Sequence, residues 1–150
     1  MKTLLGWSPI LSLVALSANA DIPSKIEGTD RLSSTSSKYE FTTASRATVV
    51  AFISANCPCS ASHEAALEAL HRKYEPLGFK FIGVHSNQDE PAAKAAEHFR
   101  ASPIRFQILS DSDAKYADIF GALKTPHVFV VSPNGEILYQ GGVDDSHTAA

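Results

Sequence analysis

Three short apolar runs alternate with helix-like stretches through the middle of the chain. The runs are rich in β-branched and aromatic residues, as strands buried on both faces are, and they cover 47–54, 79–86 and 105–110. The stretches that follow them carry helix signals at about 58–74, 89–100 and 113–121. This alternation predicts an α/β fold with a mostly parallel central sheet flanked by helices.

Two further apolar runs near the C-terminus are separated by a turn sequence. H-V-F-V-V-S (127–132) and E-I-L-Y-Q-G-G-V (136–143) flank P-N-G (133–135), a composition typical of a β-hairpin turn. We therefore expect an antiparallel hairpin to close the sheet of a domain that covers 46–150. The chain then ends on a polar segment, 144–150, that begins no further apolar run.

The first twenty residues have the layout of a secretory signal peptide, 1–20. Lys2 precedes an apolar stretch at 10–16, and A-N-A at its end supplies a small-residue cleavage site. The apolar stretch is shorter than the roughly 20 residues of a membrane span, which argues against a membrane anchor. We predict an exported protein, periplasmic or secreted. A loosely held polar leader at 21–45 is expected to hold one short strand around 39–42.

The charge of the chain is mildly acidic. Thirteen Lys and Arg against 16 Asp and Glu give a net charge of −3, and cleavage of the signal peptide removes Lys2 and no acid, which leaves −4. Without a cluster of Lys and Arg, the chain lacks the attraction to phosphates on which nucleic-acid binding depends. We therefore expect no nucleic-acid partner and, after cleavage, no stable membrane anchor.

Cys57 and Cys59 are the only cysteines of the chain, and they flank Pro58. An exported protein meets conditions in which disulfides persist, but a bridge between such near neighbours closes almost no loop and adds little stability. The pair follows a buried strand, and Pro58 fits the first turn of a helix because its missing N–H costs nothing there. Unpaired amides at a helix N-terminus stabilise a thiolate, the nucleophilic form of cysteine. The pattern therefore predicts a redox-active site.

The two sulfurs are expected to have different roles. On the predicted helix, Cys59 shares a face with one histidine and three apolar residues, which make this the buried face: His63, Leu67, Leu70 and Tyr74. We therefore expect a sheltered Cys59 as the resolving thiol and an exposed Cys57 as the attacking nucleophile. Residues two apart on a helix point away from each other, so Cys57 must lie in the turn before the helix if the two sulfurs are to bond. An unreactive pair of small residues is the structural alternative.

His63 raises a metal-binding alternative. It lies four residues after Cys59, and two thiolates with one imidazole suit a soft ion such as Cu(I). A histidine on an apolar helix face is more often a packed residue at the edge of the core, and we prefer this interpretation, with no metal and no cofactor. The remaining histidines outside the C-terminal hairpin show no partner spacing and are interpreted as surface or strand residues: His71, His85, His98 and His147.

These segments resemble the thioredoxin fold, and more narrowly its redoxin branch, the alkyl hydroperoxide reductase/thiol-specific antioxidant superfamily. The resemblance spans roughly 46–145, and the segment S-D-S-D-A-K-Y-A-D-I-F-G-A-L-K-T-P-H-V-F-V-V-S-P-N-G-E-I-L-Y-Q-G-G-V-D-D is similar to exported bacterial thioredoxin-domain proteins. The resemblance implies that Pro126 is a cis proline packed against the cysteines and that the backbone of Thr125 pairs with a bound partner. His127 follows as a minor candidate site residue.

The sequence departs from the family pattern at several points. Thioredoxins have C-x-x-C where this chain has C-x-C. Of the peroxiredoxin motif P-x-x-x-[T/S]-x-x-C, Ser54 supplies the hydroxyl, but Val50 replaces the proline. Pro126 stands where the activating arginine is expected, which argues against efficient peroxide reduction. The C-terminal helix of the family does not follow the last hairpin, so we interpret the sequence as a fragment.

The function that the sequence predicts first is that of an exported thiol–disulfide oxidoreductase. Cys57 attacks a partner disulfide beside Thr125 and Pro126, and Cys59 resolves the mixed disulfide. The expected partners are protein thiols and disulfides, together with an unidentified reductant. One alternative is a peroxiredoxin-like thiol peroxidase, an antioxidant that reduces small peroxides through a sulfenic acid at Cys57. A second alternative is a Cu(I)-binding, metallochaperone-like module that uses Cys57, Cys59 and His63.

Overall fold

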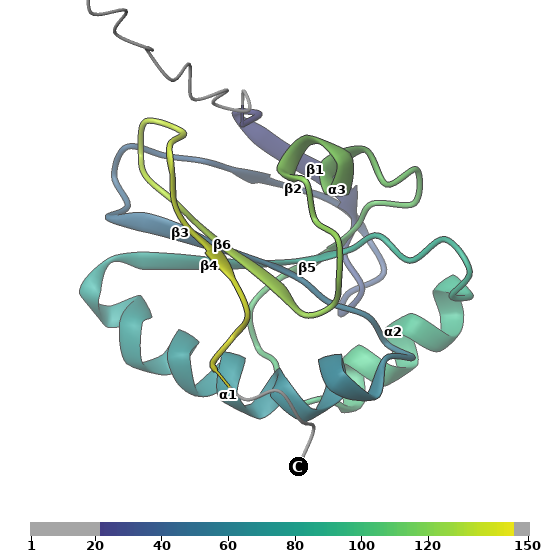
Figure 1. The fold of residues 1–150 in the computed structure, drawn as a ribbon. Helices are drawn as coiled ribbons and strands as arrows, with labels where there is room; N and C mark the ends of the chain where they lie inside the picture. The colour runs from purple at the N-terminus through teal and green to yellow at the C-terminus, as the bar shows by residue number, and fades with distance from the viewer. Residues whose placement is uncertain (1–21, 146–150) are drawn as a thin grey trace, which may run out of the picture.

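The computed structural model describes residues 22–145 (Figure 1). The signal peptide predicted at 1–20 and His147 lie outside these residues. The elements follow one another as β1 (Lys25–Thr29), β2 (Ser36–Glu40), β3 (Ala47–Phe52), α1 (Pro58–Tyr74), a short 3-10 helix (Glu75–Leu77), β4 (Phe79–His85), α2 (Ala92–Ala101), β5 (Ile108–Ser110), α3 (Lys115–Phe120), β6 (His127–Val131) and β7 (Ile137–Gly141).

A five-stranded sheet organises the domain in the order β5-β4-β3-β6-β7. Strand β4 runs parallel to both β3 and β5, whereas β6 is antiparallel to β3 and β7 is antiparallel to β6. Gly135 in the turn between β6 and β7 has a φ of 84°, a left-handed conformation that glycine adopts without steric cost. The predicted α/β class and the closing hairpin are thus confirmed.

Helices α1 and α2 cover one face of the sheet, and α3 with the β1–β2 hairpin covers the other (Figure 1). Along β3 the buried side chains alternate between two hydrophobic cores, because successive side chains of a strand point to opposite faces. Val50 and Phe52 belong to the core under α3, and Ala51 and Ile53 belong to the core under α1 and α2. This two-sided burial explains the unbroken apolar run. Among residues 22–145, no helix has the length and apolar character of a membrane span.

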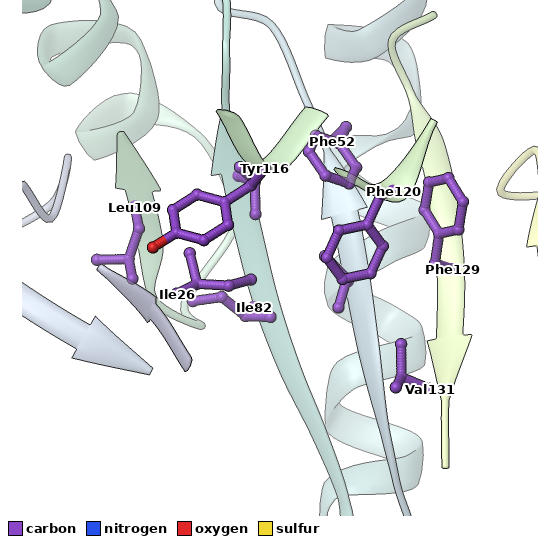
Figure 2. Close-up of a cluster of buried hydrophobic side chains, with 10 residues drawn as sticks. Ile26, Phe52, Ile82, Leu109, Tyr116, Phe120, Phe129 and Val131 are labelled. Carbon is purple, nitrogen blue, oxygen red and sulfur yellow. The ribbon is translucent and has the colours of Figure 1, made fainter. Parts of the chain in front are cut away.

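Three phenylalanines pack together in the core under α3 (Figure 2). The ring of Phe52 at the end of β3 lies 5.5 Å from the ring of Phe120 and 5.7 Å from the ring of Phe129, and the last two rings are 5.3 Å apart. Phe129 packs edge to face with each of the other two rings, a favourable arrangement of aromatic pairs, and the rings of Phe52 and Phe120 are tilted at 59° to each other. The cluster fixes the end of β3, from which the chain continues to the cysteines.

The polar leader is more ordered than predicted. It forms two paired strands, β1 and β2, and not a loosely held segment with one strand around 39–42. Ile26 of β1 is fully buried in the core under α3. The amide of Thr29 donates to Ser110 Oγ at 2.8 Å, which places β1 beside the end of β5. Gly28 makes this approach possible, since a Cβ there would overlap the carbonyl oxygen of Ser110. A single apolar residue in K-I-E-G-T gives too little periodicity for the strand to be predicted.

Candidate functional site

Cys57 lies where β3 passes into α1. It is the N-cap residue of the helix, with extended backbone angles of φ −81° and ψ 115°, and Pro58 is the first helical residue. The carbonyl of Cys57 accepts the amide of Ala61 at 3.0 Å, which begins the helical hydrogen bonding. Cys57 is therefore in the turn before the helix, as the C-x-C spacing requires, and its side chain leaves the backbone at the N-terminal end of α1.

The predicted exposure of the two cysteines is wrong. Cys57 is half-buried, whereas Cys59 is exposed. The rest of the predicted face is confirmed, since His63 and Leu67 are buried and Leu70 and Tyr74 pack against the core under α1 and α2. The buried residues of α1 are Ser60, His63, Glu64, Leu67 and Glu68. Four of these residues are polar, and each is buried with a hydrogen-bond partner, such as Ser54 N–H to Ser60 Oγ at 3.0 Å and His98 Nε2 to Glu64 Oε1 at 2.6 Å. An apolar pattern alone does not identify such a face.

The loop before β6 approaches the sulfur of Cys57. The peptide bond between Thr125 and Pro126 is cis, as the resemblance implies. The thiol of Cys57 donates a hydrogen bond to the carbonyl oxygen of Thr125, with an Sγ to O distance of 3.5 Å. The structure therefore brings together Cys57, Thr125 and Pro126, which are 68 and 69 positions apart in the sequence.

Ser54 organises the backbone on the other side of Cys57. Its hydroxyl oxygen accepts the amides of Asn56 at 3.2 Å and Cys57 at 3.0 Å, and its proton is donated to the carboxylate of Glu90. Glu90 also accepts the amide of Ala55 at 2.8 Å. The turn from 54 to 57 is therefore held by one hydroxyl and one carboxylate.

Glu90 is the site residue that the sequence did not indicate. In the sequence it precedes Pro91 at the start of a helix, where an acid is usually explained by the helix dipole. In the structure it is buried and turned toward the cysteine loop. Burial raises the pKa of Glu90, but hydrogen bonds from Ser54, His85 and Ala55 outweigh burial and hold the pKa below its ordinary value. Glu90 is therefore a carboxylate at neutral pH.

Comparison with known proteins decides the family. Residues 18–150 match the model of the Redoxin family. The chain belongs to the Redoxin family. No curated protein matches the sequence.

Solved structures show that this redoxin has a thioredoxin-like fold. An uncharacterized conserved protein from Geobacillus kaustophilus is 26% identical, with a TM-score of 0.70 over 84% of this chain and 69% of that one. A thiol-disulfide oxidoreductase from Bacteroides fragilis is 16% identical, with a TM-score of 0.66 over 81% and 89% of the two chains. A secreted disulfide oxidoreductase from Mycobacterium tuberculosis is 12% identical, with a TM-score of 0.65 over 83% and 88%. At the lower identities the likeness is one of fold.

His63 of the redoxin is buried between the first turn of α1 and the segment after β7. Its Nδ1 donates to the carbonyl oxygen of Cys59 at 2.7 Å, and its Nε2 lies 3.5 Å from the carboxylate of Asp144. The imidazole therefore joins the first turn of α1 to the segment after β7. Within 22–145, no group of three or more His, Cys, Asp or Glu side chains is arranged to hold a metal ion.

His71, His85 and His98, interpreted from the sequence as surface or strand residues, each contact a buried glutamate. His85 is a strand residue, at the end of β4, and it is buried against Glu90. His71 and His98 lie on α1 and α2, and each contacts a buried glutamate, Glu68 or Glu64. The pair of Glu68 and His71 has the regular spacing of three residues within α1. The other two contacts join different segments of the chain, so sequence spacing does not reveal them.

His127 supports the loop that carries Thr125 and Pro126. Its Nδ1 accepts the amide of Leu123 at 3.3 Å, and its ring lies 4.5 Å from the ring of Phe129. Burial, together with the nearby charge of Lys124, lowers the pKa of His127. The imidazole is therefore neutral at neutral pH, which is the form that accepts the Leu123 amide.

Acid is expected to destabilise the redoxin partly through His127. The pKa of His127 is lower in the folded chain than in the unfolded chain, where it is about 6.5. Above about pH 6.5 the imidazole is neutral in both states and the folded state has its full stability. As the pH falls from about 6.5 toward the folded pKa, the unfolded chain binds the proton first and the free energy of unfolding decreases. In His127→Asn the amide oxygen can still accept the Leu123 amide but does not titrate. Urea unfolding at neutral and mildly acidic pH should show a smaller loss of unfolding free energy for His127→Asn than for the wild type. An equal loss in both proteins would contradict the assignment.

Proposed function

We propose that this redoxin is an exported thiol–disulfide oxidoreductase in which Cys57 attacks partner disulfides and Cys59 resolves the mixed disulfide. The observation that supports the proposal is the position of the Cys57 sulfur: half-buried at the N-terminus of α1 and 3.5 Å from the carbonyl oxygen of Thr125. Export is supported by the signal-peptide pattern at 1–20.

The proposed exchange proceeds in two displacements. The Cys57 thiolate forms a bond to one sulfur of the partner disulfide, and the other partner sulfur leaves as a thiolate that takes up a proton. The Cys59 thiolate then attacks the Cys57 sulfur, forms the Cys57–Cys59 disulfide and releases the second partner thiol. The partner gains two electrons, which the cysteine pair loses. An external dithiol reductant then reduces the Cys57–Cys59 disulfide back to two thiols.

The arrangement around Cys57 suits the first displacement. Because Cys59 is exposed, its proposed attack in the second displacement requires no opening of the core. Once Cys57 has lost its proton, the carbonyl oxygen of Thr125 no longer accepts the thiol hydrogen bond. That carbonyl is then free to accept a backbone N–H of an extended partner segment, which gives Thr125 and Pro126 their proposed part in substrate binding.

Replacing Cys59 with serine tests the division of roles. Because the second displacement is lost, a covalent adduct between Cys57 and a disulfide-containing peptide should accumulate. Mass spectrometry under non-reducing conditions should give the sum of the two masses, and dithiothreitol should abolish it. The Cys57→Ser/Cys59→Ser double variant is the control. Absence of an adduct in Cys59→Ser would contradict the proposed function, and rapid consumption of the Cys57 thiol by hydrogen peroxide would favour the peroxidase alternative.

A further inference from the structure

A chain of buried polar side chains leads from the leader to the cysteine turn. Arg31, Ser54, His85 and Glu90 expose 7%, 1%, 1% and 8% of their surface, and they come from four different segments. Arg31 follows β1, His85 ends β4, Glu90 precedes α2 and Ser54 follows β3. Buried charges are costly unless they are paired, so this chain requires a physical reason beyond packing.

The hydrogen bonds among these four buried side chains have only one consistent direction. Arg31 has only donors, so its Nη2 donates to His85 Nδ1 at 3.3 Å. His85 is therefore neutral, with its proton on Nε2, and it donates to Glu90 Oε2 at 2.9 Å. Burial lowers the pKa of His85, which agrees with the neutral form. The guanidinium of Arg31 thereby supplies a positive charge one ring away from the Glu90 carboxylate.

The carboxylate determines which way the Ser54 hydroxyl points. Glu90 Oε1 accepts the Ser54 proton, while Oε2 accepts from Ala55 N–H and His85 Nε2–H. Because the hydroxyl hydrogen of Ser54 is donated to Glu90, Ser54 Oγ can only accept further hydrogen bonds. It accepts them from the amides of Asn56 and Cys57. A glutamine at 90 would have one acceptor oxygen for these three donors, so at least one contact would be lost.

From this geometry we propose that Glu90 is a positioning residue for Cys57, acting through Ser54, with Arg31 and His85 holding the carboxylate in place. The inference rests on the proposed role of Cys57 as nucleophile. The hydrogen bonds of Glu90 go to Ser54, Ala55 and His85 and not to the sulfur of Cys57. Glu90 fixes the turn that aims the sulfur at Thr125, and it places a negative charge one hydroxyl group away from the Cys57 amide.

Alkylation of Cys57 by iodoacetamide tests the proposal, because this probe reports the reactivity of the thiol whether or not disulfide exchange occurs. The parent is the full chain with Cys59→Ser, so that Cys57 is the sole thiol, and the rate is followed by mass spectrometry across a range of pH. Glu90→Gln is expected to lower the plateau rate roughly tenfold or more, the scale of a small displacement of a reacting group. Removing the negative charge is also expected to move the half-maximal rate to lower pH.

Two further variants separate positioning from stability. Ser54→Ala keeps the carboxylate but removes the link, so the plateau should fall while the pH of half-maximal rate stays close to that of the parent. Glu64→Gln removes another buried carboxylate that binds a histidine, His98, away from the turn, and should leave both quantities close to those of the parent. Should Glu90→Gln fail to fold, the plateau of Ser54→Ala decides.

The outcomes distinguish the inference from the proposed function. Rates for Glu90→Gln and Ser54→Ala that equal that of Glu64→Gln would overturn the positioning role, even if exchange occurs. A lowered plateau with the expected pH shift supports the positioning role, even in a protein whose Cys59→Ser form traps no partner, a result that would count against the proposed function alone.

Discussion

Replacing Cys57 with serine is expected to abolish reduction of a peptide disulfide, with a loss on the order of 10³-fold or more, since a hydroxyl is a far weaker nucleophile than a thiolate. Serine keeps a hydrogen-bond donor that can face the carbonyl oxygen of Thr125, and the position before Pro58 makes no demand on the side chain for capping. The fold should therefore be preserved. The measurement is the rate of peptide reduction with dithiothreitol as electron source.

The companion variant makes the result specific. Cys59→Ser retains the first displacement and should still consume the peptide disulfide once, with formation of the adduct described above. Unfolding by urea should give Cys57→Ser nearly the stability of the wild type. Should Cys57→Ser keep its activity while Cys59→Ser loses the first displacement, the exposed Cys59 would be the nucleophile, and the assignment of roles would have to be reversed.

Replacing Phe52 with alanine is expected to lower the free energy of unfolding by about 3–5 kcal/mol, the range for a buried phenylalanine truncated to alanine. Phe52 is 2% exposed and packs against the rings of Phe120 and Phe129 (Figure 2). Its removal leaves a cavity between β3 and α3 that these rigid neighbours fill only in part. Urea unfolding should show a lower midpoint with an unchanged m-value.

Leu138 offers the matched comparison. It is also an apolar strand residue, but 61% of its surface is exposed, so Leu138→Ala should lower the free energy of unfolding by less than about 1 kcal/mol. A loss for Phe52→Ala no larger than that for Leu138→Ala would show that the aromatic cluster is not a main support of the β3 end.

Much of the framework was predictable, because its signals are local. Pro58 starts α1 at the predicted residue and Tyr74 ends it, just before Pro76 and a left-handed Gly78. The apolar runs of β3 and β4 were recognisable because both faces of these strands are buried. The meeting of Cys57 with the loop before β6 came from the family resemblance, since spacing in the sequence carries no information about a contact between such distant positions.

The remaining features depend on tertiary contacts that spacing does not encode. The apolar periodicity of α1 identifies the residues that pack on the core, but it does not identify Glu64 and Glu68 as buried. Glu64 contacts His98 of α2, and Glu68 accepts the amide of Arg105 in the segment before β5. Glu90 had an adequate local explanation as an acid before a helix, and only the folded chain shows its side chain turned inward. The role of a buried polar residue can therefore be recognised only when its hydrogen-bond partners are known.

The β1–β2 hairpin has a practical consequence for gene design. It contributes Ile26 to the core and carries Arg31, whose guanidinium contacts His85 behind the cysteine turn. A shortened product starting at residue 46 would uncover apolar surface and remove the cation that contacts His85 behind the turn that carries Cys57. Expression clones for biochemistry should therefore begin upstream of Ile22, because the stretch most easily trimmed as a tail supplies both apolar packing and a positive charge behind the turn that carries Cys57.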